Sequence, residues 1–413
     1  MSKLDELIRE LCPDGVQVFR LEEIAHYAKT RIDCKTINED NYVGVENLLQ
    51  NKAGKTKATS VPTTGMVIAY QKNDILIGNI RPYLRKVWLA DCEGGTNGDV
   101  LTVQIEDTEK VLPQFLYYVL SSEKFFLYDI QNSKGAKMPR GSKDAVMKFE
   151  VPLPPPEVQR EIVRILDNFT NLTAELTAEL TARKTQYTYY RDKLLANSYK
   201  GEIKQLEECC DSIADGDHQA PPKADSGVPF ITISDIDERH EINLNVTKYV
   251  PDEYYNRLAD KRRPQKGDVL YTVVGSYGIP VYISENKRFV FQRHIAILRP
   301  NNAVIDSRYL YHAMNGTAFH RQADLAAKGA AQKTIGLASL AKMTVPVPPL
   351  DVQNRIVNVL DNFEKICSDL NIGLPAEIEA RQKQYEYYRD KLLTFAETGN
   401  TILNGTERNG TEL

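Results

Sequence analysis

The sequence predicts an α+β protein in which two similar α/β modules are joined by long helices that form an antiparallel coiled coil. Three observations lead to this prediction. A proline-rich block followed by a helical pattern occurs twice in the chain. Each copy follows a stretch of short strand-like segments and turn residues. The chain has 413 residues, of which 42% are hydrophobic, enough for two or three domains with buried cores.

The repeated block is the strongest of these signals. Val151–Gln159 returns as Val345–Gln353, which is 194 residues further along the chain, and the match continues from Leu166–Phe169 to its copy Leu360–Phe363. Weaker matches at the same offset precede the block, whereas the sequences between those matches differ almost completely. Repeated segments that enclose different sequences predict two related modules that bind different ligands.

Short strands and one helix are predicted in each module. The strands, rich in β-branched and aromatic residues, are Asp74–Gly78, Val87–Leu89 and Val100–Ile105 in the first module, and Phe230–Ile233, Asp268–Val274, Val281–Ile283 and His294–Leu298 in the second. A helix is expected after the strands, near Pro113–Ser121 and near Ser307–Met314.

A long helix is predicted after the first proline-rich hinge. From Glu157 to about Asn197 there is no glycine or proline, and apolar residues recur with the 3.5-residue spacing of a coiled-coil seam. The tetrapeptides Thr173–Leu176 and Thr177–Leu180 are identical, and a four-residue insertion is tolerated because it nearly completes a helical turn. The C-terminal counterpart is interrupted at Gly373–Pro375, so two helical pieces are expected there. Since a long apolar stripe needs a partner, the two helical regions are expected to pair.

The repeats give five predicted segments, and the last of them has no apolar pattern. They are residues 1–150 for the first module, 151–200 for the central helical region, 201–344 for the second module, 345–397 for the C-terminal helical region and 398–413 for a disordered tail.

The composition argues against several classes of protein. No apolar run approaches the roughly 18 residues of a membrane span, and Met1–Leu11 is charged, unlike a signal peptide. The six cysteines are scattered without a Cys-x-x-Cys pair, which predicts neither a metal site nor a disulfide framework and fits a reducing cytoplasm.

The net charge of −4 leaves two alternatives. Either the chain does not bind nucleic acid, or its basic residues are concentrated locally and partners supply further charge.

Over essentially its whole length the chain resembles type I restriction–modification specificity subunits. The residues that carry the resemblance are the repeated Val151–Gln159 block, the tandem Thr-Ala-Glu-Leu tetrapeptides, and Tyr187–Leu195 with its copy Tyr385–Leu393. In that family two target-recognition domains alternate with two conserved helical regions, and each domain reads one half of a split DNA target. The helical pair sets the distance between the domains. The interruption at Gly373–Pro375 departs from strict symmetry of the helices.

The resemblance also implies the partners of the chain. They are double-stranded DNA, two methyltransferase (M) subunits that dock on the helical regions, and restriction/translocase (R) subunits that join through these. No cofactor is expected on this chain, and S-adenosylmethionine, ATP and Mg²⁺ are expected on the partner subunits only. The tandem tetrapeptide is similar to a family element whose copy number adjusts the spacer in the target. Four helical residues span about 6 Å, against about 3.4 Å per base pair, so one copy corresponds to one or two base pairs.

The residues expected to contact DNA are basic, tyrosine, amide and hydroxyl side chains near glycines at equivalent places in the two modules. They are Arg81, Tyr83, Arg85, Lys86, Lys134, Lys137, Arg140 and Lys143 in the first module, and Ser276, Tyr277, Arg293, Lys328, Gln332, Lys333 and Thr334 in the second, with Arg262 and Arg263 adding charge nearby. The residues expected to bind partner subunits lie in the repeated tyrosine motif and are Tyr187, Tyr190, Arg191, Tyr385, Tyr388 and Arg389. Stacking of these tyrosines on bases is the alternative.

No motif indicates catalysis. Gly54–Thr56 is similar to the end of a phosphate-binding loop, but Leu49 stands where its first glycine is required. Glu285–Lys287 is a lone acid-x-lysine triplet, and the chain has no Gly-x-Gly-x-x-Gly and no amino-methyltransferase signature. The chain is therefore expected to be a non-catalytic subunit. The alternative from a different class is a structural adaptor, in which the coiled coil separates two protein-binding domains.

Overall fold

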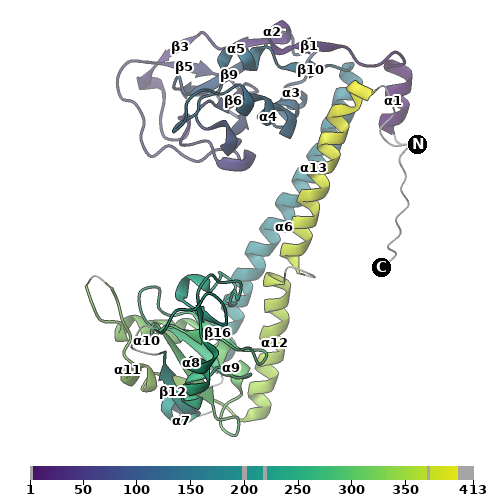
Figure 1. The fold of residues 1–413 in the computed structure, drawn as a ribbon. Coiled ribbons are helices and arrows are strands. Elements are labelled where there is room, and N and C mark those ends of the chain that lie inside the picture. The colour runs from purple at the N-terminus through teal and green to yellow at the C-terminus, as the bar shows by residue number, and fades with distance from the viewer. Residues whose placement is uncertain (1–2, 198–201, 217–220, 331, 370–372, 399–413) are drawn as a thin grey trace. The chain divides into compact units, whose positions relative to one another are not determined.

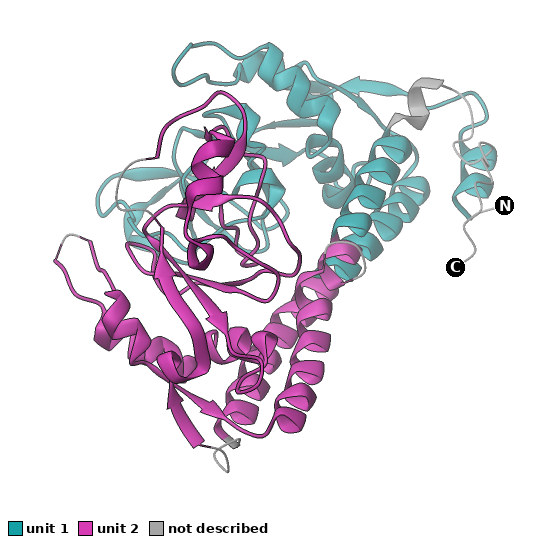
Figure 2. Cartoon of the chain, turned by 60° about the horizontal axis from the view of Figure 1, so that its bottom comes forward, with its two compact units in different colours: residues 1–174, 379–413 teal, residues 175–378 magenta. Residues whose placement is uncertain are grey.

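The computed structural model describes residues 3–197, 202–216, 221–330, 332–369 and 373–398 (Figure 1). The chain divides into two compact units, Met1–Ala174 with Glu379–Leu413, and Glu175–Ile378 (Figure 2). Each unit therefore combines one predicted module with parts of both helical regions, so the units cut across the predicted segments. The predicted disordered tail, apart from Thr398, lies outside the described residues.

Unit 1 is built on two four-stranded sheets. One has the strand order β2-β9-β6-β7 and is antiparallel throughout; the other has the order β3-β5-β8-β4 and pairs β4 with β8 in parallel. The bounds of its strands are β1 Val18–Arg20, β2 Ala25–Tyr27, β3 Arg31–Asp33, β4 Tyr42–Val43, β5 Met66–Tyr70, β6 Ile75–Gly78, β7 Val87–Leu89, β8 Gly94–Thr96, β9 Val100–Ile105 and β10 Glu150–Pro152. The helices of this module are α1 Lys3–Leu11, α2 Leu21–Ile24, α3 Pro113–Leu120, α4 Glu123–Gln131 and α5 Lys143–Met147.

Unit 2 repeats this plan. Its main sheet has the order β12-β18-β15-β16, and a second sheet has the order β14-β13-β17. The strands are β11 Glu202–Gln205, β12 Cys210–Asp215, β13 Val228–Ile231, β14 Tyr249–Val250, β15 Val269–Thr272, β16 Pro280–Tyr282, β17 Val290–Phe291, β18 Ile295–Pro300 and β19 Thr344–Val347. The helices are α7 Leu206–Cys209, α8 Asp252–Arg257, α9 Ser307–Met314, α10 Thr317–Ala326 and α11 Leu337–Ala341. The prediction of two α/β modules is confirmed.

The two ends of each module are held together by a strand pair. In unit 1, β1 pairs antiparallel with β10, and in unit 2, β11 pairs antiparallel with β19. The second strand of each pair lies directly before the proline-rich hinge, so the hinge leaves each module from a fixed point.

A buried glutamine explains why the hinge sequence is repeated. The side chain of Gln159 is fully buried, accepts a hydrogen bond from the backbone N–H of Leu112 (2.9 Å) and donates to the carbonyl oxygens of Lys110 and Pro154 (2.8 Å each). Its copy Gln353 makes the same three bonds, to Asp306 N, Val304 O and Pro348 O. Because buried polar groups need partners, this residue type is required where the loop before α3 or α9 meets the long helices.

The long helices are α6 Pro156–Asn197, α12 Leu350–Ser368 and α13 Leu374–Thr398 (Figure 1). The interruption predicted at Gly373–Pro375 thus separates α12 from α13. Each unit contains an antiparallel helix pair: in unit 1 the start of α6 shares a core with the end of α13, and in unit 2 the end of α6 shares a core with α12. Ring stacking marks both pairs, Phe169 on Tyr388 at 5.5 Å and Tyr190 on Phe363 at 5.8 Å between ring centroids. The predicted antiparallel coiled coil is confirmed.

The main core of each module lies between its first sheet and its helices. In unit 1 it includes Ile75, Ile77 and Leu101 from the sheet and Leu116 and Phe125 from α3 and α4. In the described residues no helix is long and apolar enough to cross a membrane.

Candidate nucleic-acid interface

The first module brings its two predicted DNA-contacting clusters together. We define the first-module loops as residues 79–86, which follow β6, and residues 134–141, which precede α5. Residue Arg140 pairs with both Ile80 and Lys134 in isolated β-bridges. The backbone N–H of Arg81 donates to Pro139 O at 2.7 Å, and that of Gly141 donates to Asn79 O at 3.0 Å. The two loops are therefore joined along their backbones.

The second module holds the corresponding loops in the same way. We define the second-module loops as residues 273–278 and 328–335, of which residue 331 is not described. Thr334 pairs with both Val274 and Lys328 in isolated bridges, and the N–H of Gly275 donates to Lys333 O at 2.9 Å. These bonds fall 194 residues after those of the first module, so the offset found in the sequence is also a structural equivalence.

Most predicted DNA-contacting side chains of the first-module loops are exposed. Tyr83 is 46% exposed, and Arg81, Lys134 and Lys137 are exposed too, as is the predicted Lys143 just after the second loop, at the start of α5. Arg81 occupies a left-handed backbone conformation (φ 54°), which turns the chain sharply after β6. Arg140 is exposed as well and forms an ion pair with Asp99 at 3.2 Å.

Two residues of the first module that were predicted to contact DNA have partners within the module. Arg85 binds both carboxylate oxygens of Glu123 on α4, with a 3.0 Å bond from Nε to Oε2, and this pairing lowers the pKa of Glu123. Lys86 donates from Nζ to Val45 O at 2.7 Å, and burial lowers its pKa. Arg85 and Lys86 therefore hold the loop to its own module through partners that are distant in the sequence, and their contact with DNA stays a prediction.

In the second-module loops, the predicted residues Ser276, Lys328, Gln332, Lys333 and Thr334 are exposed. Tyr277 is half-buried and donates to Asp324 Oδ1 on α10 at 2.9 Å, so its hydroxyl fixes the loop. Arg293 is exposed in the turn before β18, and the next residue, His294, accepts a backbone hydrogen bond from Val273 at 2.8 Å. Arg293 therefore lies beside the second-module loops.

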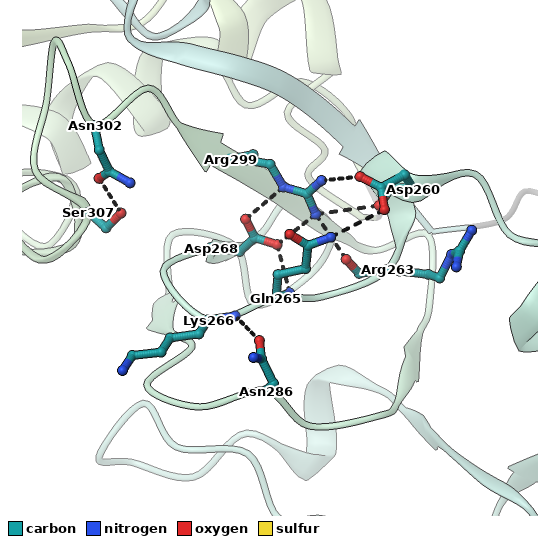
Figure 3. A network of polar contacts seen from close by, with 9 residues as sticks. All are labelled: Asp260, Arg263, Gln265, Lys266, Asp268, Asn286, Arg299, Asn302 and Ser307. Carbon is teal, nitrogen blue, oxygen red and sulfur yellow. Dashed lines mark hydrogen bonds and ion pairs between the residues drawn. The ribbon is translucent and has the colours of Figure 1, made fainter.

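The additional arginines proposed for the second module have structural partners. Arg262 pairs with Asp215 at 3.7 Å, and Arg263 donates from Nε to Leu258 O at 3.0 Å. The carbonyl of Arg263 belongs to a network centred on Arg299, whose guanidinium binds Asp268 and Asp260 (Figure 3). This network fixes the segment before β15, at the opposite end of that strand from the loops.

Comparison with known proteins identifies the family. The family model for the type I restriction modification DNA specificity domain matches the chain twice, at residues 13–183 and 200–380. The chain belongs to this family. It is 32% identical over 307 residues to a putative type I restriction enzyme specificity subunit of Haemophilus influenzae, covering 71% of this chain and 74% of that protein.

Two further similarities agree with the family assignment. The chain is 34% identical over 273 residues to the EcoR124I/EcoR124II specificity subunit of Escherichia coli, covering 60% of this chain and 63% of that protein. The fold is similar, with a TM-score of 0.60 and 20% identity, to a solved chain from a study of complex assembly and conformational transition in the type I restriction–modification system. That comparison covers 92% of this chain and 98% of the other.

The repeated tyrosine motif of this specificity protein faces mostly inward. Arg191 is 7% exposed and packs on the ring of Tyr187, while Arg389 is 2% exposed and packs on the ring of Tyr385. The hydroxyl of Tyr187 lies 3.3 Å from His312 Nδ1. The assignment of Tyr187, Arg191, Tyr385 and Arg389 to partner binding stays a prediction, and in this structure the four side chains pack within the chain. These side chains attach each helix to its own module, because they share the helix face that carries the leucines.

The exposed members of the motif are different tyrosines. Tyr189 is 58% exposed and Tyr387 is 60% exposed. Each has a lysine one helical turn later: Lys193 Nζ lies 5.5 Å from the Tyr189 ring centre, and Lys391 Nζ lies 5.3 Å from that of Tyr387. Tyr190 and Tyr388, whose partner binding stays a prediction, stack on phenylalanines of the paired helix, and Tyr190 is 38% exposed. The 3.6-residue helical period, counted from the buried leucines, would have distinguished the exposed tyrosines of the motif from the inward-facing ones.

One cluster in unit 2 has the residue types of a metal site. The His312 ring nitrogen Nε2 lies 2.7 Å from Asp361 Oδ1, and Glu364 is close to both. Arg308 binds Asp361 at 2.8 Å and also binds Glu364, so a guanidinium already supplies the positive charge for both carboxylates. Burial alone would raise the pKa of Asp361, but hydrogen bonds from His312 and Arg308 lower it. The equivalent place in unit 1 holds a Tyr118–Asp167 hydrogen bond, and the cluster is best explained as a structural contact between α9 and α12.

Proposed function

We propose that the chain is the DNA-reading subunit of a type I restriction–modification complex, and that each module reads one half of a two-part DNA target. The observation that carries the proposal is the repeated loop pair. Two family-matched modules present loops of the same backbone geometry but with different exposed side chains. Because base edges are distinguished by the side chains that reach them, different loops favour different half-sites and hence an asymmetric target.

The loop side chains suit both parts of DNA recognition. Arg81, Lys134 and Lys137 of the first module carry positive charge that attracts phosphates, and arginine also suits the O6 and N7 atoms of guanine. Gln332 of the second module suits the N6 and N7 atoms of adenine, beside Lys333. The net charge of −4 describes the whole chain and does not exclude local positive charge in the loops.

We infer that the chain itself performs no chemistry. In this proposal two M subunits dock on the helical regions, R subunits join through them, and S-adenosylmethionine, ATP and Mg²⁺ bind to those partners. The exposed pairs Tyr189–Lys193 and Tyr387–Lys391 support this arrangement. They have the same composition and geometry and lie one in each unit, as expected if two copies of one partner bind.

The length of helix α6 is proposed to set the length of the spacer, which is the stretch of DNA between the two half-sites that neither module reads. The helix continues without a break through both Thr-Ala-Glu-Leu tetrapeptides. Removing Thr177–Leu180 would shorten it by about 6 Å and rotate its ends by about 40°, since each residue adds 1.5 Å and about 100°. We propose that this deletion shortens the spacer by one or two base pairs and leaves both half-sites unchanged.

The test is to co-express the chain with its methyltransferase partner in a host without DNA methylation and to map the methylated bases. The proposal expects an asymmetric two-part motif with a fixed gap. The double substitution K134A/K137A should weaken methylation, whereas K72A, an exposed lysine before the other end of β6, should leave it unchanged. A soluble complex that methylates nothing and does not bind DNA would favour the adaptor function instead.

A further inference from the structure

Two buried oxygen atoms beneath the first-module loops have no hydrogen-bond partner among the described residues. They are Asp129 Oδ1 on α4 and Asn79 Oδ1 at the end of β6. Asp129 is 1% exposed and Asn79 is 6% exposed. Leaving a buried acceptor unpaired destabilises the folded state. A native fold that keeps two such atoms together needs a physical explanation.

Both oxygen atoms converge on Gly141, the residue that joins the two loops. A Cβ atom built on Gly141 would overlap Asp129 Oδ1 and lie 2.8 Å from Asn79 Oδ1. The backbone of Gly141 donates to Asn79 O at 3.0 Å. Asn79, Asp129 and Gly141 therefore form one contact between α4 and both first-module loops. Neither oxygen has a donor among the described residues, and a proton on the Asp129 carboxyl group would supply one.

The second module has no polar group at this place. The residues equivalent to Asn79, Asp129 and Gly141 by the 194-residue offset are Val273, Ala323 and Ile335. They are 3%, 1% and 1% exposed and belong to the hydrophobic core of unit 2. The backbone contact is the same, since Ile335 N donates to Val273 O at 2.8 Å. At these three positions the second module has only hydrocarbon, although Tyr277 also ties its loops to α10 through Asp324, so the buried polar pair is a feature of the first module.

The surroundings of Asp129 favour its neutral form. Burial raises the pKa of this carboxyl group to about 6. Tyr27 of β2 faces it, and burial followed by the charge of Asp129 raises the pKa of that tyrosine. The other charged groups on the segments packed nearby are Asp99 and Arg140, which pair with each other, and Lys143 and Asp144 at the start of α5. Within the described residues none of these has a hydrogen bond or ion pair with Asp129.

We propose that Asp129 is a proton-dependent positioning residue of the first module: as a neutral carboxylic acid it donates a hydrogen bond to Asn79 Oδ1 and so holds both first-module loops in the arrangement that reads DNA. The inference rests on the proposed role of these loops in DNA recognition. When Asp129 loses its proton, two acceptors face each other and the contact between α4 and the loops is lost. The second module, with hydrocarbon at this place, is unaffected.

The experiment measures the affinity of the chain, in complex with its methyltransferase partner, for a duplex carrying its target between pH 5.5 and 7.5. With a pKa of about 6, the neutral fraction of Asp129 falls about 25-fold over this range, so the affinity should fall by up to about 25-fold. D129N should remove this component, because an amide donates to Asn79 at every pH. D144N, which removes a neighbouring carboxylate, should keep the wild-type profile.

A second variant guards against failure of D129N to fold. The triple substitution N79V/D129A/G141I transfers the hydrocarbon set of the second module and should bind DNA without the pH-dependent component. Wild-type and D129N profiles that coincide would overturn the inference, since the amide of Asn79 would then donate to an ionised Asp129. If the complex forms but no variant binds DNA at any pH, the proposed function itself fails, and this outcome is distinct from binding without a pH difference.

Discussion

Replacing Gln159 by alanine should destabilise unit 1 without affecting unit 2. The substitution leaves the N–H of Leu112 and the carbonyl groups of Lys110 and Pro154 without their side-chain partner in a fully buried place. At about 1 kcal/mol for each of three hydrogen bonds, the free energy of unfolding should fall by about 3 kcal/mol. With a urea dependence of about 3 kcal/mol per molar, the unfolding midpoint should fall by about 1 M.

The single tryptophan makes the assay specific for unit 1. Trp88 is the only tryptophan of the chain, lies in β7 and is 8% exposed, so its fluorescence reports unfolding of unit 1. The matched control is Gln353→Ala, which removes the equivalent three bonds in unit 2 and should shift only a transition followed by far-ultraviolet circular dichroism. A Trp88 transition that Gln159→Ala does not move, or that Gln353→Ala moves equally, would refute the reasoning.

Three further predictions concern DNA, partners and pH. K134A/K137A should reduce the slope of log affinity for DNA against log salt concentration by about 2, measured by fluorescence anisotropy, because each lysine that meets a phosphate contributes about 0.9; an unchanged slope would place these lysines away from DNA. Tyr189→Ala and Tyr387→Ala should each weaken assembly with the methyltransferase subunit in analytical ultracentrifugation while leaving the urea unfolding midpoint, followed by far-ultraviolet circular dichroism, within about 0.3 M of wild type; full assembly of both variants would contradict the docking face. The pKa of Asp129 is raised from 3.8 to about 6 by burial, so its contribution to stability is complete below about pH 4 and is lost as pH rises through about 6. The loss amounts to about 3 kcal/mol, and equal pH profiles of wild-type and D129N unfolding midpoints would contradict it.

Most of the architecture could be predicted from the sequence repeats. The 194-residue offset predicted not only two modules but also the equivalence of the two loop pairs, which the backbone hydrogen bonds reproduce residue by residue. The predicted strands agree with β6, β7, β9, β15, β16 and β18 within about two residues, and the helix Ser307–Met314 coincides with α9. Hydrophobic, β-branched runs of this kind are recognisable because they fill a sheet that is buried by helices.

The second sheets were predicted only in part: the predicted strand Phe230–Ile233 overlaps β13 of unit 2, whereas the second sheet of unit 1 was not predicted. Its strands in unit 1 are two to five residues long, and β8 contains Gly94 and Gly95, which give no apolar signal. The glycines are needed because a Cβ on Gly94 would lie against Asn41 O and the Tyr70 hydroxyl. Such contacts join residues that are distant in the sequence, so a local sequence pattern does not reveal them.

The structure pairs the loops that carry the predicted DNA-contacting residues, but the contacts of individual side chains could not be read from the sequence. The loops that carry Lys134 and Lys328 are where the sequence put them, yet Arg85 binds a glutamate 38 residues away and Lys86 binds a carbonyl 41 residues away. A basic side chain near a glycine does not reveal whether a distant partner already neutralises it. The inward face of the tyrosine motif was accessible from the helical period, since Tyr187 and Arg191 are four residues apart.

The most direct test of the central claim changes one module and maps both half-sites. Methylation would be compared between the wild-type complex and one carrying Q332A/K333A, which alters the second-module loops only. The account predicts an asymmetric two-part motif in which one half is relaxed by the substitution, while the other half and the gap stay unchanged. A motif in which both halves change together, or a single palindromic site, would contradict the division of the target between the two modules.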